Sequence, residues 1–122
     1  MDRHPWEIEF YERDTGRCPA TEFIQDLSKK DQVLITKAVE RLGQYGPDLR
    51  RPYVDHLDGD IWELRVRVPS GHVRMLYFFF DGRKIVITHG LVKKQGPVPR
   101  SEIERAVAYR SEYLARESKR QH

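Results

Sequence analysis

Three β-rich segments separated by two short turns constrain the fold of this chain more than any other feature. The segments include residues 62–65, 74–77 and 89–94. Asp81-Gly82 stands between two β-rich runs, where this dipeptide is a strong signal for a two-residue hairpin turn. The other connection is Pro69-Ser70-Gly71-His72. The sequence therefore predicts three consecutive antiparallel strands.

Each turn also predicts which residues of its two strands lie opposite each other. One register follows from the turn at Asp81-Gly82, and the other from a turn that closes on Val68 and Val73. The predicted pairs are Phe80–Arg83, Phe78–Ile85, Leu76–Ile87 and Arg74–His89 in one hairpin, and Arg67–Arg74, Arg65–Leu76 and Trp62–Phe79 in the other. Because a slip of one residue exchanges the two faces of a strand, the predicted faces depend on both turns.

Side chains alternate between the two sides of a strand, so this register sorts them into two faces. One face is expected to be a core, made of Trp62, Leu64, Val66, Met75, Tyr77, Phe79 and Val86. The other is expected to be cationic, with almost no acid to neutralise it. It carries Glu63, Arg65, Arg67, Arg74, His89 and Lys93, together with Leu76, Phe78, Ile85 and Ile87.

The distribution of charge is more informative than the net charge of +3. Residues 61–100 contain eight Lys or Arg residues and two acidic residues, whereas the rest of the chain has a small excess of acid. A basic sheet with mildly acidic flanks is typical of a phosphate binder. Charged edge strands also serve to prevent association between sheets, and charge alone favours the two interpretations equally.

The rest of the sequence predicts the scaffold around these strands. The expected elements are a strand at 6–11, helices beginning at Pro19, near Asp31 and at Ser101, and a loop at 47–60. The order β-α-α-β-β-β-α predicts an α+β fold, an antiparallel sheet with two N-terminal helices on one face and a C-terminal helix, with the helices on one side of the sheet. A length of 122 residues suits one domain over 1–122.

Several classes of protein and site are not expected. The single cysteine, Cys18, has no internal disulfide partner, which is typical of a reducing compartment. No stretch approaches the length of a membrane span, and the first residues do not form a signal peptide, so a cytoplasmic protein without membrane contact is expected. Metal-ligand spacings and phosphate-binding glycine loops are absent from the sequence, so no cofactor and no metal are expected.

An ordered set of short motifs resembles the HigB-type, phage-related branch of the RelE/ParE toxin superfamily. The motifs are Glu63-Leu64-Arg65, Val73-Arg74-Met75-Leu76-Tyr77, Thr88-His89-Gly90-Leu91-Val92-Lys93-Lys94, then Pro99, Glu102-Ile103, Ala106 and Tyr113. Cys18-Pro19-Ala20, Glu22-Phe23-Ile24 and Leu27 resemble the first helix of the same family. The resemblance covers about residues 6–114 and rests on the order of the motifs. The family usually has Phe where Leu91 stands.

The resemblance implies a type II toxin that cleaves mRNA, usually on the translating ribosome in its decoding site. It also implies neutralisation by a small helix-turn-helix antitoxin encoded nearby, with DNA contacted only through that antitoxin. The residues it implies in the activity are Arg65, Arg74, Lys93 and Lys94.

The chemistry of RNA cleavage suggests roles for these residues. Attack by the 2′-hydroxyl requires a base, stabilisation of the charged phosphorane and an acid for the 5′-oxygen, and it leaves a 2′,3′-cyclic phosphate without a metal. Arginine binds two phosphate oxygens at once, so Arg65 and Arg74 are expected to stabilise charge. Lys93 or Lys94 could take part in proton transfer or bind phosphate. His89 has a suitable intrinsic pKa for acid or base work.

Simpler interpretations remain for each residue. Arg67 is expected to bind nucleic acid, but a strand arginine is often only solvated. His89 could be a hydrogen-bonded histidine of the sheet. Glu63 is expected to be a partner of neighbouring arginines rather than a base.

Two alternative functions also remain. One is a gyrase-poisoning toxin of the same superfamily, and the other is a non-catalytic regulatory or binding protein derived from a toxin. The Lys93-Lys94 and Glu63-Leu64-Arg65 motifs favour the nuclease.

Overall fold

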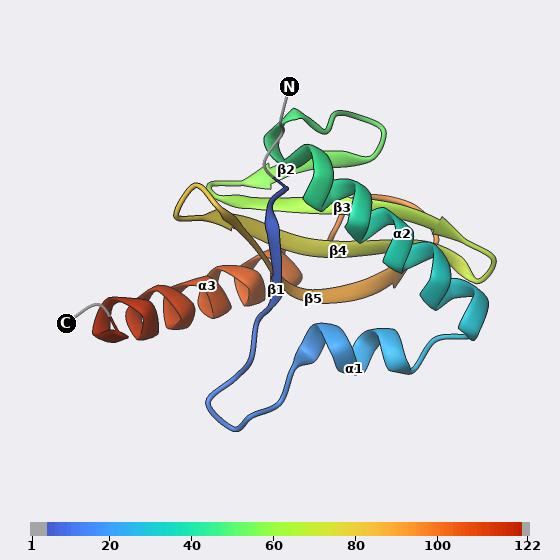
Figure 1. Ribbon diagram of the computed structural model, residues 1–122. Coiled ribbons are helices and arrows are strands. Elements are labelled where there is room, and N and C mark those ends of the chain that lie inside the picture. Colours follow the sequence, from blue (N-terminus) through green and yellow to red (C-terminus); the bar gives the residue numbers. More distant parts are fainter. Residues whose placement is uncertain (1–4, 121–122) are drawn as a thin grey trace.

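A five-stranded sheet in the order β1-β5-β4-β3-β2 forms the centre of the computed structural model, which describes residues 5–120 (Figure 1). The strands are β1 (Glu7–Phe10), β2 (Val54–Asp58), β3 (Ile61–Val68), β4 (Gly71–Phe80) and β5 (Lys84–Lys93). The helices are α1 (Pro19–Gln25), α2 (Lys29–Tyr45) and α3 (Arg100–Arg120), with a 3-10 turn at Gly46–Asp48 after α2. The α+β class and the predicted order of elements are confirmed.

The structure adds one strand to this order. β2 lies inside the stretch 47–60, which the sequence predicts as a loop, and it pairs in an antiparallel manner with β3. The strand has only five residues, and two of them are aspartates, so the local sequence only weakly favours a strand. Pairing with β3 therefore decides its conformation. At the other edge, β1 pairs with β5 in a parallel manner.

The hairpin of β3 and β4 forms as predicted but with a register shifted by two residues. Val68 pairs with Gly71, so the turn has two residues, Pro69 and Ser70. Arg65 therefore faces Arg74, and the predicted pairs Arg67–Arg74, Arg65–Leu76 and Trp62–Phe79 are wrong. Because the shift is an even number of residues, each side chain keeps its predicted face.

The hairpin of β4 and β5 departs from the prediction at two places. Phe80 pairs with Lys84, so the turn has three residues, and a bulge leaves Thr88 without a partner in the ladder. His89 consequently faces Leu76, and the predicted pair Arg74–His89 is wrong. The remaining predicted pairs, Phe80–Arg83, Phe78–Ile85 and Leu76–Ile87, are also wrong.

The two departures compensate each other beyond the bulge. Between the turn and the bulge the faces are exchanged, so Ile85 and Ile87 lie in the core with Met75, and Val86 lies on the other side. After the bulge, His89 and Lys93 return to the face that holds Arg74. A β-bulge has this effect because it inserts one residue into only one strand.

Helices cover both faces of the sheet, not one as the sequence predicts (Figure 1). α1 and α2 pack on the face of Leu64, Met75 and Tyr77. α3 packs on the opposite face through a second core, made of Tyr11, Ile61, Leu76, Phe78, Val86, Val98, Ile103, Ala106, Tyr109 and Tyr113. The face expected to be cationic is therefore apolar and covered at one end. None of the helices within residues 5–120 is long and apolar enough to cross a membrane.

The start of α2 also differs slightly from the prediction near Asp31. The helix begins at Lys29, because the Ser28 side chain accepts a hydrogen bond from the Asp31 backbone N–H at 3.2 Å. This N-cap satisfies one of the N–H groups that the first turn of a helix leaves without a partner. The predicted helix end at Gly46-Pro47 is confirmed, and Gly46 adopts a φ of 54°.

Gly90 lies where β5 packs closely against α1. A Cβ at this position would lie 2.5 Å from Met75 Sδ and 2.6 Å from Phe23 Cδ2. We expect Gly90→Ala to reduce the free energy of unfolding by about 1–3 kcal/mol, because it overpacks a filled core. Urea denaturation measures this change. Val92→Ala alters a side chain on the same strand that is 41% exposed and is the control. Equal stability of the two variants would contradict the prediction.

Candidate nucleic-acid interface

Two arginines of adjacent strands share one buried carboxylate. Arg65 of β3 and Arg74 of β4 are a direct cross-strand pair, and Glu63 lies two residues before Arg65 on the same face. Arg74 Nη1 donates to Glu63 Oε1 at 2.7 Å, and Arg65 Nε donates to Glu63 Oε2 at 3.1 Å. The Glu63 side chain is only 3% exposed. The prediction that Glu63 serves as a partner of arginines is confirmed.

A second carboxylate, that of Asp55 on β2, holds Arg65 from the other side. Arg65 Nη2 donates to Asp55 Oδ2 at 3.0 Å, and Arg51 Nε donates to Asp55 Oδ1 at 3.1 Å. Burial acts to raise the pKa of Asp55, but the hydrogen bonds from Arg51 and the His56 backbone N–H, with the charges of Arg51 and Arg65, outweigh it and lower the pKa. Asp55 is therefore ionised at neutral pH.

The expectation of a cationic face with almost no acid is wrong at this position. Three guanidinium groups, those of Arg51, Arg65 and Arg74, surround the two carboxylates of Glu63 and Asp55. The cluster keeps an excess of positive charge, and its ion pairs fix the orientation of each guanidinium. A guanidinium has five N–H donors. The described contacts to carboxylates use Nη1 of Arg74 and Nε and Nη2 of Arg65, which leaves donors for a phosphate.

A groove of about 540 Å³ adjoins the arginine pair at the edge of β3. β2 pairs with β3 only as far as Val54 and Leu64, so the edge of β3 beyond this point opens towards α2. The groove is lined by Leu34, Lys37, Ala38 and Arg41 of α2, Pro52 and Tyr53 of the loop, and Arg65, Val66, Arg67, His72 and Arg74 of the sheet. All of its charged lining residues are basic. We call this cavity the edge groove.

Of the other predicted basic site residues, Arg67 lines this groove and the two lysines do not. Arg67 lines it and is exposed. Lys93 pairs with His72 and so lies on the face of Arg74, although it does not line the groove. Lys94 follows the last residue of β5. The structure therefore brings together Arg65, Arg67 and Arg74, with Lys93 on the neighbouring strand.

His89 lies in a buried network under α3. Its Nε2 is 2.9 Å from Glu102 Oε1, and its Nδ1 is 3.0 Å from Thr88 Oγ1. Burial, then the positive charge of Arg105, lowers the pKa of His89 to about 4, against the opposing effect of Glu102. The residue is 1% exposed. These surroundings fit the interpretation of His89 as a hydrogen-bonded histidine of the sheet.

The burial of His89 predicts a dependence of stability on pH. Its pKa is lowered from 6.5 to about 4 on folding. The unfolded chain therefore binds more protons than the folded chain between these values. We expect the free energy of unfolding to fall as pH is lowered through this window, by up to about 3 kcal/mol.

Urea denaturation of the wild type and His89→Gln at pH 7 and pH 5 measures this effect. The wild type is expected to lose more stability than the variant on acidification. An equal loss in both proteins would show that His89 is not the responsible group.

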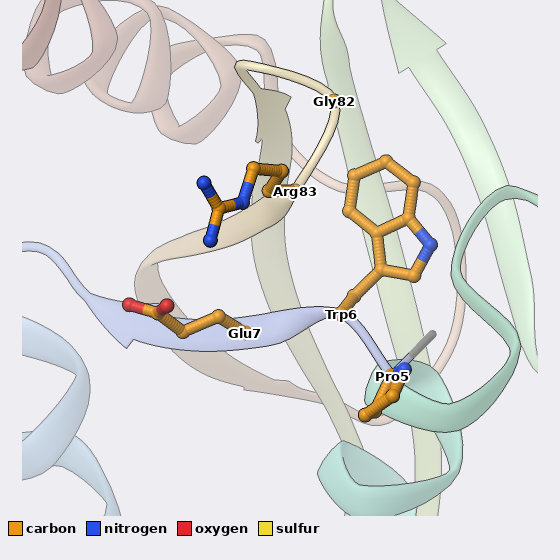
Figure 2. A pocket seen from close by; sticks show the side chains of 5 residues that line it. All are labelled: Pro5, Trp6, Glu7, Gly82 and Arg83. Atoms are coloured by element: carbon orange, nitrogen blue, oxygen red, sulfur yellow. The ribbon is translucent and has the colours of Figure 1, made fainter. Parts of the chain in front are cut away.

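A second cleft, of about 400 Å³, lies where β1 begins beside the β4–β5 turn. In Figure 2 the Glu7 and Arg83 side chains lie at the left of the view and the Trp6 ring lies to their right. The Trp6 ring packs edge-on against Phe79, with 5.2 Å between ring centroids. The cleft is lined by one acid and one arginine, so it lacks the excess of positive charge found in the edge groove.

Several residues of the interface escape sequence reasoning. Asp55 and Tyr53 lie in a stretch that the sequence predicts as a loop, and His72 lies in a predicted turn. Lys37 and Arg41 are four residues apart on α2, and this spacing places both on one side of the helix. That spacing is the one signal in the sequence that points to them.

Comparison with known proteins places the chain in a family. Residues 22–110 match the model of the family described as Phage derived protein Gp49-like (DUF891). This family is toxin-like and of the RelE type. The match includes β2 to β5 and therefore Glu63, Arg65 and Arg74. A search of curated proteins found no match.

Proposed function

The chain belongs to the Gp49-like family of phage-derived, toxin-like proteins, and from this premise we propose that it is the toxin of a type II toxin–antitoxin pair. Its activity is that of an mRNA endonuclease of the HigB type, which acts in the cytoplasm on the translating ribosome and thereby inhibits translation. The observation that carries the proposal is the pair of Arg65 and Arg74, held on one sheet face by Glu63.

The arginine pair suits the stabilisation of a phosphorane. When the 2′-hydroxyl attacks the neighbouring phosphorus, negative charge accumulates on the non-bridging oxygens. Two guanidiniums already oriented by ion pairs meet that charge without reorganisation, which is usually a large part of catalysis. Arg74 is the more firmly oriented of the two, because its side chain is only 14% exposed and its hydrogen bond to Glu63 is 2.7 Å long.

Proton transfer in the proposed reaction falls to the lysines. Lys93 lies on the face of Arg74, one strand away, and Lys94 follows it directly. A lysine ammonium group donates a proton to the departing 5′-oxygen, while the proton of the attacking 2′-hydroxyl passes to water; the other lysine binds the flanking phosphate. His89 takes no part, because it is buried under α3 and bonded to Glu102. The products are a 2′,3′-cyclic phosphate and a 5′-hydroxyl.

Ribosomes programmed with a defined mRNA test the activity. We expect purified protein to produce new RNA ends within the codon in the decoding site, and to produce none when ribosomes are omitted. Cuts that persist without ribosomes would make it a free ribonuclease. Intact mRNA with double-strand breaks in DNA would assign it instead to the gyrase-poisoning toxins of the superfamily. Harmless expression of the folded protein would make it a regulatory protein.

The proposal includes a protein partner. A type II toxin requires an antitoxin, and the resemblance to the HigB branch indicates a small helix-turn-helix protein encoded nearby. DNA would then be contacted through this partner. Co-expression with the neighbouring reading frame should relieve growth inhibition, whereas inhibition that persists in a stable complex would contradict this assignment.

A further inference from the structure

We propose that the edge groove is a nucleotide-binding subsite for single-stranded RNA, in which Tyr53 stacks on a base while Lys37 and Arg67 bind the flanking phosphates. The inference rests on the proposed function and deepens it. It assigns a role to residues that lie outside the arginine pair, and it specifies how the substrate approaches that pair.

The backbone of Tyr53 is held by a hydrogen bond, whereas its side chain is exposed to solvent. Its carbonyl oxygen accepts a hydrogen bond from the Arg65 backbone N–H at 2.8 Å, which ties it directly to the strand of the arginine pair. Its own side chain nevertheless remains 43% exposed. A large ring held at a fixed position in a groove, and left open to solvent, is the form of a stacking platform for a base.

Arg41 supports this ring from α2. Its guanidinium carbon lies 4.4 Å from the centroid of the Tyr53 ring, within the range of a cation–π interaction. The contact limits the motion of the ring and places a positive charge beside it. Because the guanidinium lies over one face of the ring, a base would stack on the other face.

The remaining cations of the edge groove differ from the arginine pair because they have no carboxylate partner among residues 5–120. Arg65 and Arg74 are ion-paired to carboxylates, whereas within residues 5–120 no ion pair involves Lys37, Arg41 or Arg67. Uncompensated positive charge inside a concave surface attracts anions. Arg67 is exposed, and Lys37 lies one helical turn before Arg41. These residues therefore provide a basic path along the edge of β3.

The combination favours single-stranded RNA over other anions. Cations alone would suit any polyanion, but an open ring requires a ligand with a flat apolar surface, and a duplex keeps its base faces stacked inside. The groove is also lined by Arg65 and Arg74. A base on Tyr53 would consequently belong to a nucleotide close to the phosphate that is cut.

Binding without cleavage tests the subsite separately from the nuclease activity. The probe is a fluorescent single-stranded RNA of about eight nucleotides, 2′-O-methylated so that it resists cleavage, and binding is followed by anisotropy. We expect Tyr53→Ala to weaken binding by about 5- to 100-fold, and Tyr53→Phe to bind within about twofold of the wild type. Lys37→Ala is expected to reduce the dependence of affinity on salt.

Three controls make the result specific. Phe10→Ala removes a ring that is 36% exposed on β1, at the opposite edge of the sheet, and should leave affinity unchanged. Tyr53→Leu keeps the apolar bulk without the aromatic ring and substitutes for Tyr53→Ala if that variant does not fold. An abasic version of the RNA should bind equally to the wild type and to Tyr53→Leu, because it has no base to stack.

The outcomes separate the subsite from the nuclease proposal. Loss of affinity in Tyr53→Ala and Tyr53→Leu, with no cleavage of natural mRNA by the wild type, would uphold the subsite and overturn the nuclease. Cleavage by the wild type, with equal affinity in Tyr53→Ala and Tyr53→Leu, would overturn the subsite alone. An acidic peptide that displaces the RNA and binds all variants equally would assign the groove to a protein partner.

Discussion

RNA cleavage by the Arg74→Lys variant is expected to be about 100- to 1000-fold slower than cleavage by the wild type. Lysine keeps the positive charge and a bond to Glu63, but it lacks the planar fork that binds two phosphate oxygens. Arg74 is the more buried member of the pair, with a side chain that is 14% exposed. Single-turnover kinetics on programmed ribosomes measure the change.

The control for this substitution is Arg83→Lys, which changes an exposed arginine in the turn after β4. We expect it to cleave at the wild-type rate. Thermal denaturation shows whether both variants are folded. A folded Arg74→Lys protein that cleaves as fast as the wild type would show that the arginine pair is structural, and the proposed chemistry would have to move to another site.

Replacing Glu63 by glutamine is expected to lower the free energy of unfolding by about 3 kcal/mol. The substitution keeps the size of the side chain but removes the charge that Arg65 and Arg74 share. Breaking a buried ion pair on one side leaves cations without a counter-charge in a poorly solvated place. For a chain of this size, such a loss is a large fraction of the total stability.

Urea denaturation at neutral pH measures this loss. Glu104→Gln is the matched control, because Glu104 is 67% exposed and pairs with Arg100 at 3.6 Å on the surface of α3. A surface pair contributes at most about 1 kcal/mol, so this variant should unfold close to the wild type. Equal effects of the two substitutions would contradict the assignment of Glu63 as the buried counter-charge.

The sequence predicts the faces of β3 and β4 correctly although it predicts their register wrongly. The turn at Pro69-Ser70 closes two residues earlier than expected, and an even shift preserves the alternation of side chains. Arg65 and Arg74 therefore lie on one face as predicted. Their direct pairing depends on the length of the turn, which the local sequence leaves open between two and four residues.

The bulge at Thr88 could not be predicted from the strand pattern. Thr88 is buried, and its hydroxyl donates to the Leu76 carbonyl at 3.2 Å, so a cross-strand contact stabilises the extra residue. The three-residue turn moves Ile85 and Ile87 into the core beneath α1 and α2, and the bulge returns His89 and Lys93 to the face of Arg74. Contacts of this kind form only once the strands have paired, and they leave no periodic signal.

The placement of α3 is a further feature that the sequence leaves undecided. Its apolar stripe predicts that the helix packs on the sheet, but not on which face. Tyr109 and Tyr113 bury their rings against Tyr11 and Phe78 on the face opposite α2. That choice encloses His89 and removes it from the candidate site.

The sequence predicts the residues of the candidate site that lie on β3 and β4, but not the residues that surround them. Strand alternation predicts that Arg65, Arg67 and Arg74 share a face, and the sequence also predicts Glu63 as a partner of these arginines. Asp55 and Tyr53 lie beside β3 only because β2 pairs with it, so their part in the site is a tertiary property.

The chemical nature of the cut RNA ends is the most direct test of the central claim, which is that the arginine pair stabilises attack by a 2′-hydroxyl. The substrate is the programmed mRNA with a single 2′-deoxy nucleotide on the 5′ side of the mapped cut. We expect the deoxy substitution to abolish cleavage there, and the unmodified RNA to yield a 2′,3′-cyclic phosphate and a 5′-hydroxyl. Cleavage of the deoxy substrate, or ends that carry a 5′-phosphate, would contradict the account.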